Sequence, residues 1–590
     1  MPVTSSNPTL QPSGQTVPQI LPPIHTVGPA IVLSGGGAKG DFEVGAVRCL
    51  YNKGIRPKIL CGTSVGSVNA LKLAEGEDTP VQGTPPAGHV RGLAGLEKIW
   101  LDLNTDPDMW SLEPGVSAIF TALENLPAEA NVLEKEASQV SSASIFGIVL
   151  SIFGVPGFVS FAPQLGDLGN LSNSASQILE SLAGTLTDAE NILGMANYDP
   201  LEALMRKPSS FFLPFQQQSG IVLRLAMVAL EDGALRYVNE NNVMIERDGT
   251  TTKVPPPLTA AQLAQLKGQL AEANAKAATL APSQPGDPGP FQKPRPGLAA
   301  AKQQAAQLQA QLDWQELPKD LIRAAIASSS LPVICRPTEM QDLRTYVDGG
   351  IRTLAPIQAA IDAGASQVYV VAAGSTKFDA STLAQIGSST PLPLLGIALR
   401  VGEQILPDEV GRRDLFPDNP YPVPVMVIQP DPSLDDIHDG LTIEPGLIRI
   451  RMAYGFMRAY DTFVAFQKFN SSAYQSAAEQ NSIAGKTEEI IQLRKQIWDL
   501  EFPANGKAFE LPTSALPPAP YTVKNIGAPD ANAHAQVKTL KAKLKTLLDA
   551  RIAHYTDAAN NINGTESLPA DFATWPTQWE KHSWAPVVPL

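Results

Sequence analysis

The residue with the clearest chemical potential is a serine that lies between two glycines. The sequence CGTSVGS at residues 61–67 holds a G-x-S-x-G motif centred on Ser64, and it closely follows a short apolar run at 59–61. This pattern is typical of a strand that stops at a sharp turn and starts a helix, which holds one serine hydroxyl out of the sheet. Gly62 and Gly66 flank the serine because larger side chains would collide in such a turn. Ser64 is therefore a candidate nucleophile, with a plain glycine–serine turn as the alternative.

A run of glycines lies upstream, in the sequence SGGGAKG at residues 34–40. It follows a strand-like apolar run at 30–33 and precedes a helix that we predict over 41–53. Successive glycines before a helix expose backbone N–H groups at the positive end of that helix, which suits an anion. That anion is either a phosphate or a developing oxyanion.

The spacing Gly35-x-Gly37-x-x-Gly40 also fits the dinucleotide-binding fingerprint, which needs an acidic residue about 20 residues further on to hold the ribose. Residues 62–64 stand at that position and contain no carboxylate. A Walker loop requires Ser or Thr directly after its lysine, whereas here Gly40 follows Lys39. The oxyanion interpretation is therefore favoured.

The third motif lies far downstream, in the sequence YVDGG at residues 346–350. Asp348 follows a short apolar run and precedes Gly349 and Gly350, which places it at a strand end where the backbone turns tightly. By itself, Asp-Gly-Gly is most often only a turn. In combination with the other two motifs, Asp348 becomes a candidate general base.

Taken together, SGGGAKG, GTSVG, ASSSLPVICRP leading to YVDGG, and AAIDAGASQVYVV resemble the patatin-like phospholipase family, with the motifs in the family's order. The resemblance covers residues 27–463 with two large interruptions. One departure is visible after the Asp-Gly-Gly, where the family often has an asparagine before its proline and this chain has RTLAP at 352–356.

The resemblance implies a role for each motif residue. Asp348 would take the proton of Ser64 directly, as a Ser–Asp dyad, and none of the six histidines lies in the three motifs. The N–H groups of Gly35, Gly36 and Gly37 would form the oxyanion hole. Lys39 falls where the family has a basic residue. The remaining motif residues would support the turns: Gly40, Gly62, Gly66, Gly349 and Gly350.

The implied activity is that of a lipid acyl hydrolase of the phospholipase A type, which cleaves carboxylic esters of phospholipids through an acyl-enzyme. The alternative is a catalytically weak patatin-like protein that acts mainly as a membrane- or partner-binding module. The sequence shows no metal-ligand spacing, and we expect neither a metal nor a cofactor. The expected partners are an acyl-ester lipid and a membrane surface.

Composition narrows the class of partner and the compartment. The chain has 590 residues and a formal charge of −14, which argues against a nucleic-acid partner. Three cysteines without Cys-x-x-Cys spacing are expected to be reduced and buried. Residues 1–27 contain no Lys or Arg and do not resemble a signal peptide. We therefore expect a cytoplasmic protein with peripheral membrane association, although export of a leaderless chain stays open.

The alternation of strands and helices over 30–73 predicts a mostly parallel central sheet covered by helices on both faces. We expect a three-layer α/β/α patatin-like fold with two helical insertions and a helical C-terminal extension. The expected parts are a disordered leader (1–27), a catalytic domain (28–465) with insertions at 104–197 and 241–316, and a C-terminal extension (466–590).

The two insertions differ in kind. The first carries an apolar run at 144–161, interrupted by Gly154, Pro156 and Gly157, which predicts either a buried helical hairpin or a lid that meets lipid. The second carries Leu and Ala at alternating spacings of three and four. That spacing predicts two antiparallel helices with a coiled-coil seam. The hairpin at 258–312 is either a self-packed structural arm or a protein-binding arm.

Overall fold

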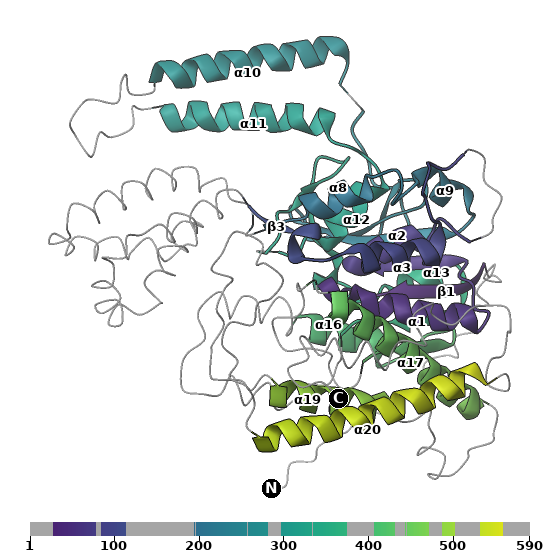
Figure 1. The fold of residues 1–590 in the computed structure, drawn as a ribbon. Helices are drawn as coiled ribbons and strands as arrows, with labels where there is room; N and C mark the ends of the chain where they lie inside the picture. The colour runs from purple at the N-terminus through teal and green to yellow at the C-terminus, as the bar shows by residue number, and fades with distance from the viewer. Residues whose placement is uncertain are drawn as a thin grey trace, which may run out of the picture.

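The computed structural model describes residues 27–77, 84–113, 194, 196–256, 258–280, 297–332, 334–374, 406–430, 443, 445–470, 487–501 and 531–557. Figure 1 shows a body of helices around a sheet, a helical hairpin that projects from one side, and two helices on the opposite side. Within these ranges, no helix combines the length and the apolar character that a membrane crossing requires.

The described strands form one mixed sheet of nine strands. Its main order is β11-β10-β1-β2-β5-β6-β7, with β9 also paired to β5 and β8 paired to β9. The pairs from β11 to β5 are parallel, and the pairs that involve β6 to β9 are antiparallel. The strands are β1 (Gly28–Leu33), β2 (Ile59–Thr63), β5 (Val222–Ala229), β6 (Leu235–Val238), β7 (Met244–Glu246), β8 (Thr338–Glu339), β9 (Thr345–Asp348), β10 (Ala365–Val371) and β11 (Val425–Ile428).

A further strand pair, β3 (Ser111–Leu112) and β4 (Ala196–Asn197), lies outside this sheet. The helices are α1 (Gly40–Asn52), α2 (Val65–Leu73), α3 (Gly92–Asp102), α8 (Asp199–Met205), α9 (Leu213–Gln218), α10 (Ala260–Leu280), α11 (Leu298–Glu316), α12 (Leu321–Ser329), α13 (Ile357–Asp362), α16 (Leu406–Leu415), α17 (Pro445–Asn470), α19 (Thr487–Glu501) and α20 (Ala531–Thr556).

The central strands are apolar throughout because helices cover both faces of the sheet. In β1, Ile31 and Leu33 belong to the core formed with α1, α2, α3, α12 and α17. Ala30 and Val32 point the other way and belong to a second core, formed with α13 and the end of α16. The predicted three-layer α/β/α fold with a parallel sheet at its centre is therefore confirmed.

Helix α1 lies between the sheet and α17, and two glycines allow the two helices to touch. An added Cβ at Gly45 would lie 1.8 Å from the carbonyl oxygen of Met452, and one at Gly455 would lie 2.0 Å from that of Phe42. At the start of α1, the buried Asp41 accepts hydrogen bonds of 2.8 and 2.9 Å from Nε of Arg451 on α17.

The C-terminal helices α19 and α20 pack on α17 and continue its core. Arg551 of α20 pairs with Asp461 of α17 at 2.9 Å, and the ring of Tyr555 packs edge-on against Phe456. Ile490 of α19 is fully buried in the same core. Residues of the C-terminal region thereby complete the layer that covers α1.

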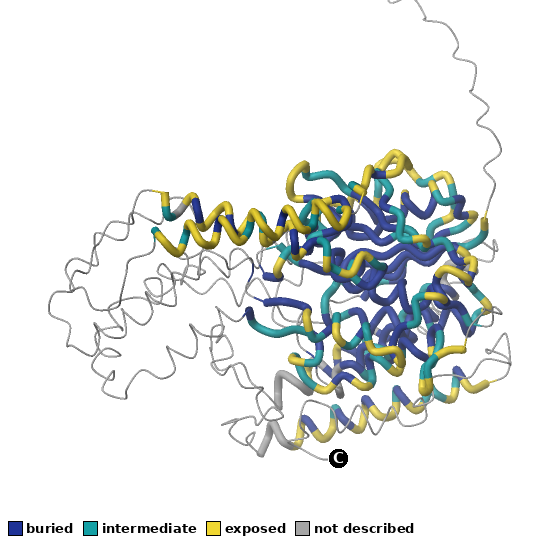
Figure 2. Tube along the Cα trace, turned by 90° about the horizontal axis from the view of Figure 1, so that it is seen from above, coloured by how far each residue is buried: buried dark blue, intermediate teal, exposed yellow. Residues whose placement is uncertain are grey.

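Helices α10 and α11 fill most of the second insertion and pack against each other as a hairpin (Figure 1). Most of their surface is exposed, as the yellow segments at the left of Figure 2 show. Trp314 near the end of α11 is buried and donates from Nε1 to the carbonyl of Met340 at 2.8 Å, which ties the hairpin to the body. The apolar run predicted as a lid, 144–161, lies outside the described residues.

The glycine contacts between α1 and α17 make a prediction about stability. Gly45→Ala and Gly455→Ala should each lower the free energy of unfolding by about 1–3 kcal/mol or more, because a backbone carbonyl occupies the space of the new methyl group. Gly268→Ala is the matched control: Gly268 lies inside α10 with nothing within 4 Å of its Cβ position. That substitution should raise stability by about 0.5–1 kcal/mol. If urea denaturation gave the same change in the free energy of unfolding for all three variants, the close contact between α1 and α17 would be contradicted.

Candidate active site

The register along β5 brings two candidate residues together. Strand β2 pairs with β5 as far as Thr63, which stands opposite Ala226. Strand β9 pairs antiparallel with β5 and ends at Asp348, opposite Met227. Because β6 pairs with β5 over the same stretch, β2 and β9 must share the other edge of β5. The two strands therefore meet end to end, with Ser64 directly after one and Asp348 at the end of the other.

Ser64 lies in a strained turn between β2 and α2. Its backbone has φ 54° and ψ −135°, outside the region that non-glycine residues ordinarily occupy, at a cost of about 1–3 kcal/mol. The turn is tight on both sides. A Cβ at Gly62 would lie 2.5 Å from the carbonyl oxygen of Gly66, and a Cβ at Gly66 would lie 2.4 Å from that of Leu33. The glycines predicted on both sides of Ser64 are therefore required because no larger side chain would fit there.

Asp348 is buried beside the serine. Its carboxylate accepts a hydrogen bond of 2.6 Å from the N–H of Gly350. Burial raises the pKa of Asp348 from its ordinary value to about 6, while hydrogen bonding by the Ser64 hydroxyl and the Gly350 N–H holds it lower than burial alone would. The carboxylate is therefore ionised at neutral pH and is a stronger base than an exposed aspartate.

The glycine loop packs directly against the serine. A Cβ at Gly35 would lie 3.0 Å from Cβ and 3.7 Å from Oγ of Ser64, so a larger residue there would press against the serine. A Cβ at Gly36 would lie 2.5 Å from the side chain of Ala373, at the other side of the loop. Among the described residues, the N–H groups of Gly35 and Gly36 donate to no backbone carbonyl. Gly37 has φ +57° and begins the short 3-10 turn that leads into α1.

The other predicted motif residues hold the backbone close to this centre. Lys39 is half-buried before α1, and its N–H donates to the carbonyl of Gly36 at 3.1 Å. A Cβ at Gly40 would lie 2.7 Å from Val65, so this glycine lets the start of α1 approach the start of α2. At Gly349, a Cβ would lie 2.5 Å from the carbonyl oxygen of Ala226.

Sequence reasoning missed a buried polar network under the glycine loop. Asn69 of α2 donates at 2.9 Å both to the carbonyl of Gly40 and to the carboxyl of Glu43, and it accepts from Nε1 of Trp100. Glu43 is also hydrogen-bonded to Ser34 at the start of the loop. Burial raises the pKa of Glu43 well above its ordinary value, in spite of the lowering effect of the Asn69 hydrogen bond, and thus favours the neutral acid. No motif in the sequence marked this network.

The glycine loop is also fastened from the opposite side by α17. Nη2 of Arg451 donates to the carbonyl of Ala38 at 3.0 Å, and its Nε binds Asp41. Arg451 is 410 residues away from Asp41 in the sequence, so no local pattern could have paired them.

The described histidine side chains are engaged elsewhere. The ring nitrogens of His89 lie 3.0 Å from the carboxylate of Glu75 and 3.2 Å from the carbonyl of Pro208. Nε2 of His554 lies 3.0 Å from the hydroxyl of Tyr460. In the part of the chain with described side chains, the carboxylate of Asp348 is thus the basic group that lies beside Ser64.

Comparisons with known proteins agree with this site. The family model "Patatin-like phospholipase" matches residues 31–82, which contain the glycine loop and the Ser64 turn. The patatin-like phospholipase domain-containing protein ZK370.4 of Caenorhabditis elegans is 41% identical over 73 residues, 12% of this chain and 5% of that protein. Triacylglycerol lipase ptl3 of Schizosaccharomyces pombe is 42% identical over 45 residues, 8% of this chain and 9% of that protein.

The chain therefore spans less than a tenth of the length of these curated relatives in the matched segments. The crystal structure of VipD from Legionella pneumophila aligns over 95% of this chain and 91% of that one, at 12% identity and a TM-score of 0.23. That TM-score is too low to support an argument. The sequence segment that holds the glycine loop and the serine turn, by contrast, is similar to the patatin-like phospholipase family.

Proposed function

We propose that the protein is a lipid acyl hydrolase of the phospholipase A type that works through a Ser64–Asp348 dyad. The observation that carries the proposal is the meeting of Ser64 with the buried carboxylate of Asp348 at one edge of β5, next to a loop of three glycines. Family and relatives named for phospholipase and lipase activity support a lipid substrate. The intact pair favours an enzyme over a catalytically weak binding module.

In the first half of the reaction, the Ser64 oxygen attacks the ester carbonyl while Asp348 accepts the hydroxyl proton. The carbonyl oxygen becomes an oxyanion, which the N–H groups of Gly35, Gly36 and Gly37 would hold at the positive end of the turn into α1. When the tetrahedral intermediate collapses, the proton on Asp348 passes to the departing alcohol. The products are a lysolipid and an acyl group esterified to Ser64.

In the second half, water attacks the acyl-enzyme and gives its proton to Asp348. The fatty acid leaves, and Ser64 regains its hydroxyl proton. Each residue returns to its starting state, so the cycle needs no group other than water and the ester. Within this proposal the catalytic domain is 28–465, the substrate is an ester lipid in a membrane to which the protein binds peripherally, and the hairpin at 258–312 is available to a protein partner.

The nucleophile can be tested by covalent labelling. A fluorophosphonate should react with Ser64, since its hydroxyl is hydrogen-bonded to a base, and Ser64→Ala should abolish labelling and ester hydrolysis together. His89→Gln is the control and should keep most of both, because His89 binds Glu75 and Pro208. Mass spectrometry that located the label on another serine would overturn the assignment.

The raised pKa of Asp348 predicts how activity depends on pH. An ionised carboxylate is required, so hydrolysis should fall as the pH drops through about 6. Asp348→Asn removes the proton acceptor, and hydrolysis should fall by about 100- to 10,000-fold. A profile that stayed flat down to pH 4.5 in the wild-type protein would contradict this role.

The same substitution should affect stability in the opposite direction. A buried carboxyl whose pKa is raised from its ordinary value to about 6 destabilises the folded state above that pH, by about 3 kcal/mol at roughly 1.4 kcal/mol per pKa unit. The cost disappears once both folded and unfolded forms are protonated. Asp348→Asn should therefore melt at a higher temperature than the wild type near pH 8, and the difference should vanish towards pH 4. A lower melting temperature at pH 8 would show that the carboxylate stabilises the fold.

A further inference from the structure

The end of helix α12 makes hydrogen bonds to both candidate catalytic residues. Oγ of Ser328, in its last turn, accepts a hydrogen bond from the backbone N–H of Ser64 at 3.0 Å. Two residues later, the carbonyl of Ser330 accepts from the backbone N–H of Asp348 at 2.8 Å. A single turn of chain thus contacts the backbone of the nucleophile and that of its base.

The hydroxyl of Ser328 uses its whole hydrogen-bonding capacity, which is one donor and two acceptor positions. It donates to the carbonyl of Ala226 on β5, a group that can only accept. It must therefore act as acceptor towards both remaining partners, the N–H of Ser64 and the hydroxyl of Ser67 at 2.7 Å. Because Ser328 is fully buried, water cannot replace any of the three bonds.

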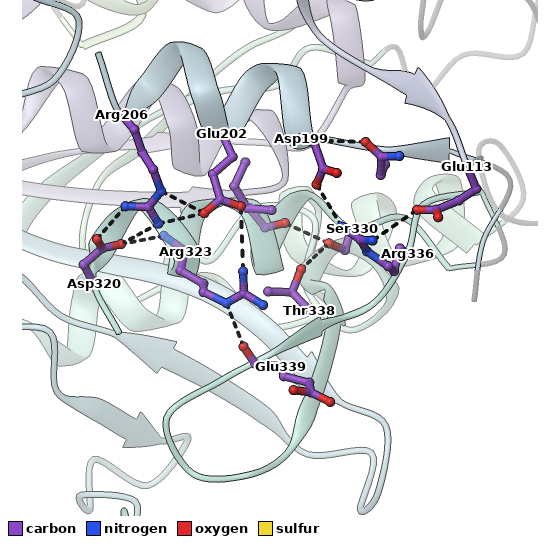
Figure 3. Close-up of polar contacts among 12 residues, drawn as sticks. Glu113, Asp199, Glu202, Arg206, Asp320, Arg323, Ser330, Arg336, Thr338 and Glu339 are labelled. Carbon is purple, nitrogen blue, oxygen red and sulfur yellow. Dashed lines mark hydrogen bonds and ion pairs between the residues drawn. The ribbon is translucent and has the colours of Figure 1, made fainter. Parts of the chain in front are cut away.

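The opposite end of α12 is held in place by ion pairs, which Figure 3 shows. Asp320 caps the helix by accepting from the N–H of Arg323 at 3.0 Å, and it also binds Arg206 of α8 at 2.8 Å. Arg206 in turn binds Glu202 at 2.9 Å. Nε of Arg323 donates to the carbonyl of Glu339 at 3.0 Å. The helix is therefore fixed at its start and presents its last turn in a defined position.

The last turn is fixed as well. The hydroxyl of Ser330 donates to the carbonyl of Ile326 at 2.9 Å and lies 2.9 Å from the hydroxyl of Thr338 (Figure 3). Ser329 differs from its neighbours, since its hydroxyl donates at 3.0 Å to the carbonyl of Ala325 within the helix. Of the three consecutive serines, Ser328 alone contacts the Ser64 turn within the described residues.

We propose that Ser328 is a positioning residue that holds Ser64 in its strained conformation and at hydrogen-bonding distance from Asp348. The inference rests on the proposed function of these two residues. The bond to Ser328 is the described hydrogen bond of the Ser64 N–H. Without the Ser328 hydroxyl, this N–H would no longer help to hold the Ser64 backbone at φ 54°. The same bond occupies the Ser64 N–H, so that group does not serve the oxyanion.

The test compares Ser328→Ala with Ser329→Ala in the full-length protein. The rate of fluorophosphonate labelling and the kcat for a soluble short-chain ester should fall about 10- to 100-fold in Ser328→Ala, with KM changed less than threefold, because a misplaced nucleophile reacts slowly but leaves the binding surface intact. Ser329→Ala loses a buried hydroxyl from the same turn and should stay within twofold of the wild type. Equal losses in the two variants would overturn the proposal.

A pH profile distinguishes positioning from general loosening of the fold. The hydrogen bond from Ser64 lowers the pKa of Asp348, so its weakening in Ser328→Ala should move the acid limb of the profile to higher pH. Should Ser328→Ala fail to fold, Ser328→Cys fills similar space with a weak hydrogen-bonding group and should show the same two effects. A folded Ser328→Cys with wild-type labelling and an unmoved limb would refute the positioning role.

The experiments distinguish failure of the positioning role of Ser328 from failure of the proposed Ser64–Asp348 dyad. If Ser64→Ala is inactive and unlabelled while the Ser328 variants behave like Ser329→Ala, the positioning role fails and the dyad stands. If Ser64→Ala still hydrolyses the ester, the dyad itself is wrong, and the positioning role falls with it.

Discussion

Two strands share one edge of β5, and the site depends on where each of them ends. Strand β2 leaves that edge opposite Ala226, and β9 reaches it from the other direction opposite Met227. The meeting point is occupied by Ser64 and Asp348. A one-residue slip of β9 would turn Asp348 to the opposite face of the sheet, because side chains alternate along a strand. The distance between Ser64 and Asp348 thus depends on strand register before it depends on either side chain.

In the proposed dyad, the burial of Asp348 takes the place of the histidine of a triad. An exposed aspartate is too weak a base at neutral pH, whereas desolvation raises the pKa of this one to about 6. The Ser64 hydroxyl and the Gly350 N–H keep the carboxylate ionised in spite of burial. At Gly62, Gly66 and Gly349 an added methyl group would collide with a backbone carbonyl, so these glycines allow the strand ends and the turn to pack closely.

Much of this architecture could be predicted from sequence because the signals are local. The apolar runs before residues 34 and 62, and the glycines after them, specify strand, turn and helix within a few positions. The residues that brace the site lack such a signal. Asn69, Glu43 and Arg451 are single polar residues within helices, and only the packing of α1 against α2 and α17 brings them together. The serines at 328–330 belong to the ASSSLPVICRP stretch of the resemblance, but the different role of each depends on which way it faces.

The pairing of Asp41 with Arg451 also has a meaning for the order in which the chain is made. All three sequence motifs are complete by residue 350, yet the carboxylate at the start of α1 stays without this guanidinium until a residue 410 positions later has been synthesised. During translation, the glycine loop would border on a carboxylate that favours water over a hydrophobic core. The glycine loop gains its contacts with Arg451 only after α17 has been synthesised and has packed against α1. Assembly of the glycine loop in its final form therefore waits for Arg451, which follows all three motifs in the order of synthesis.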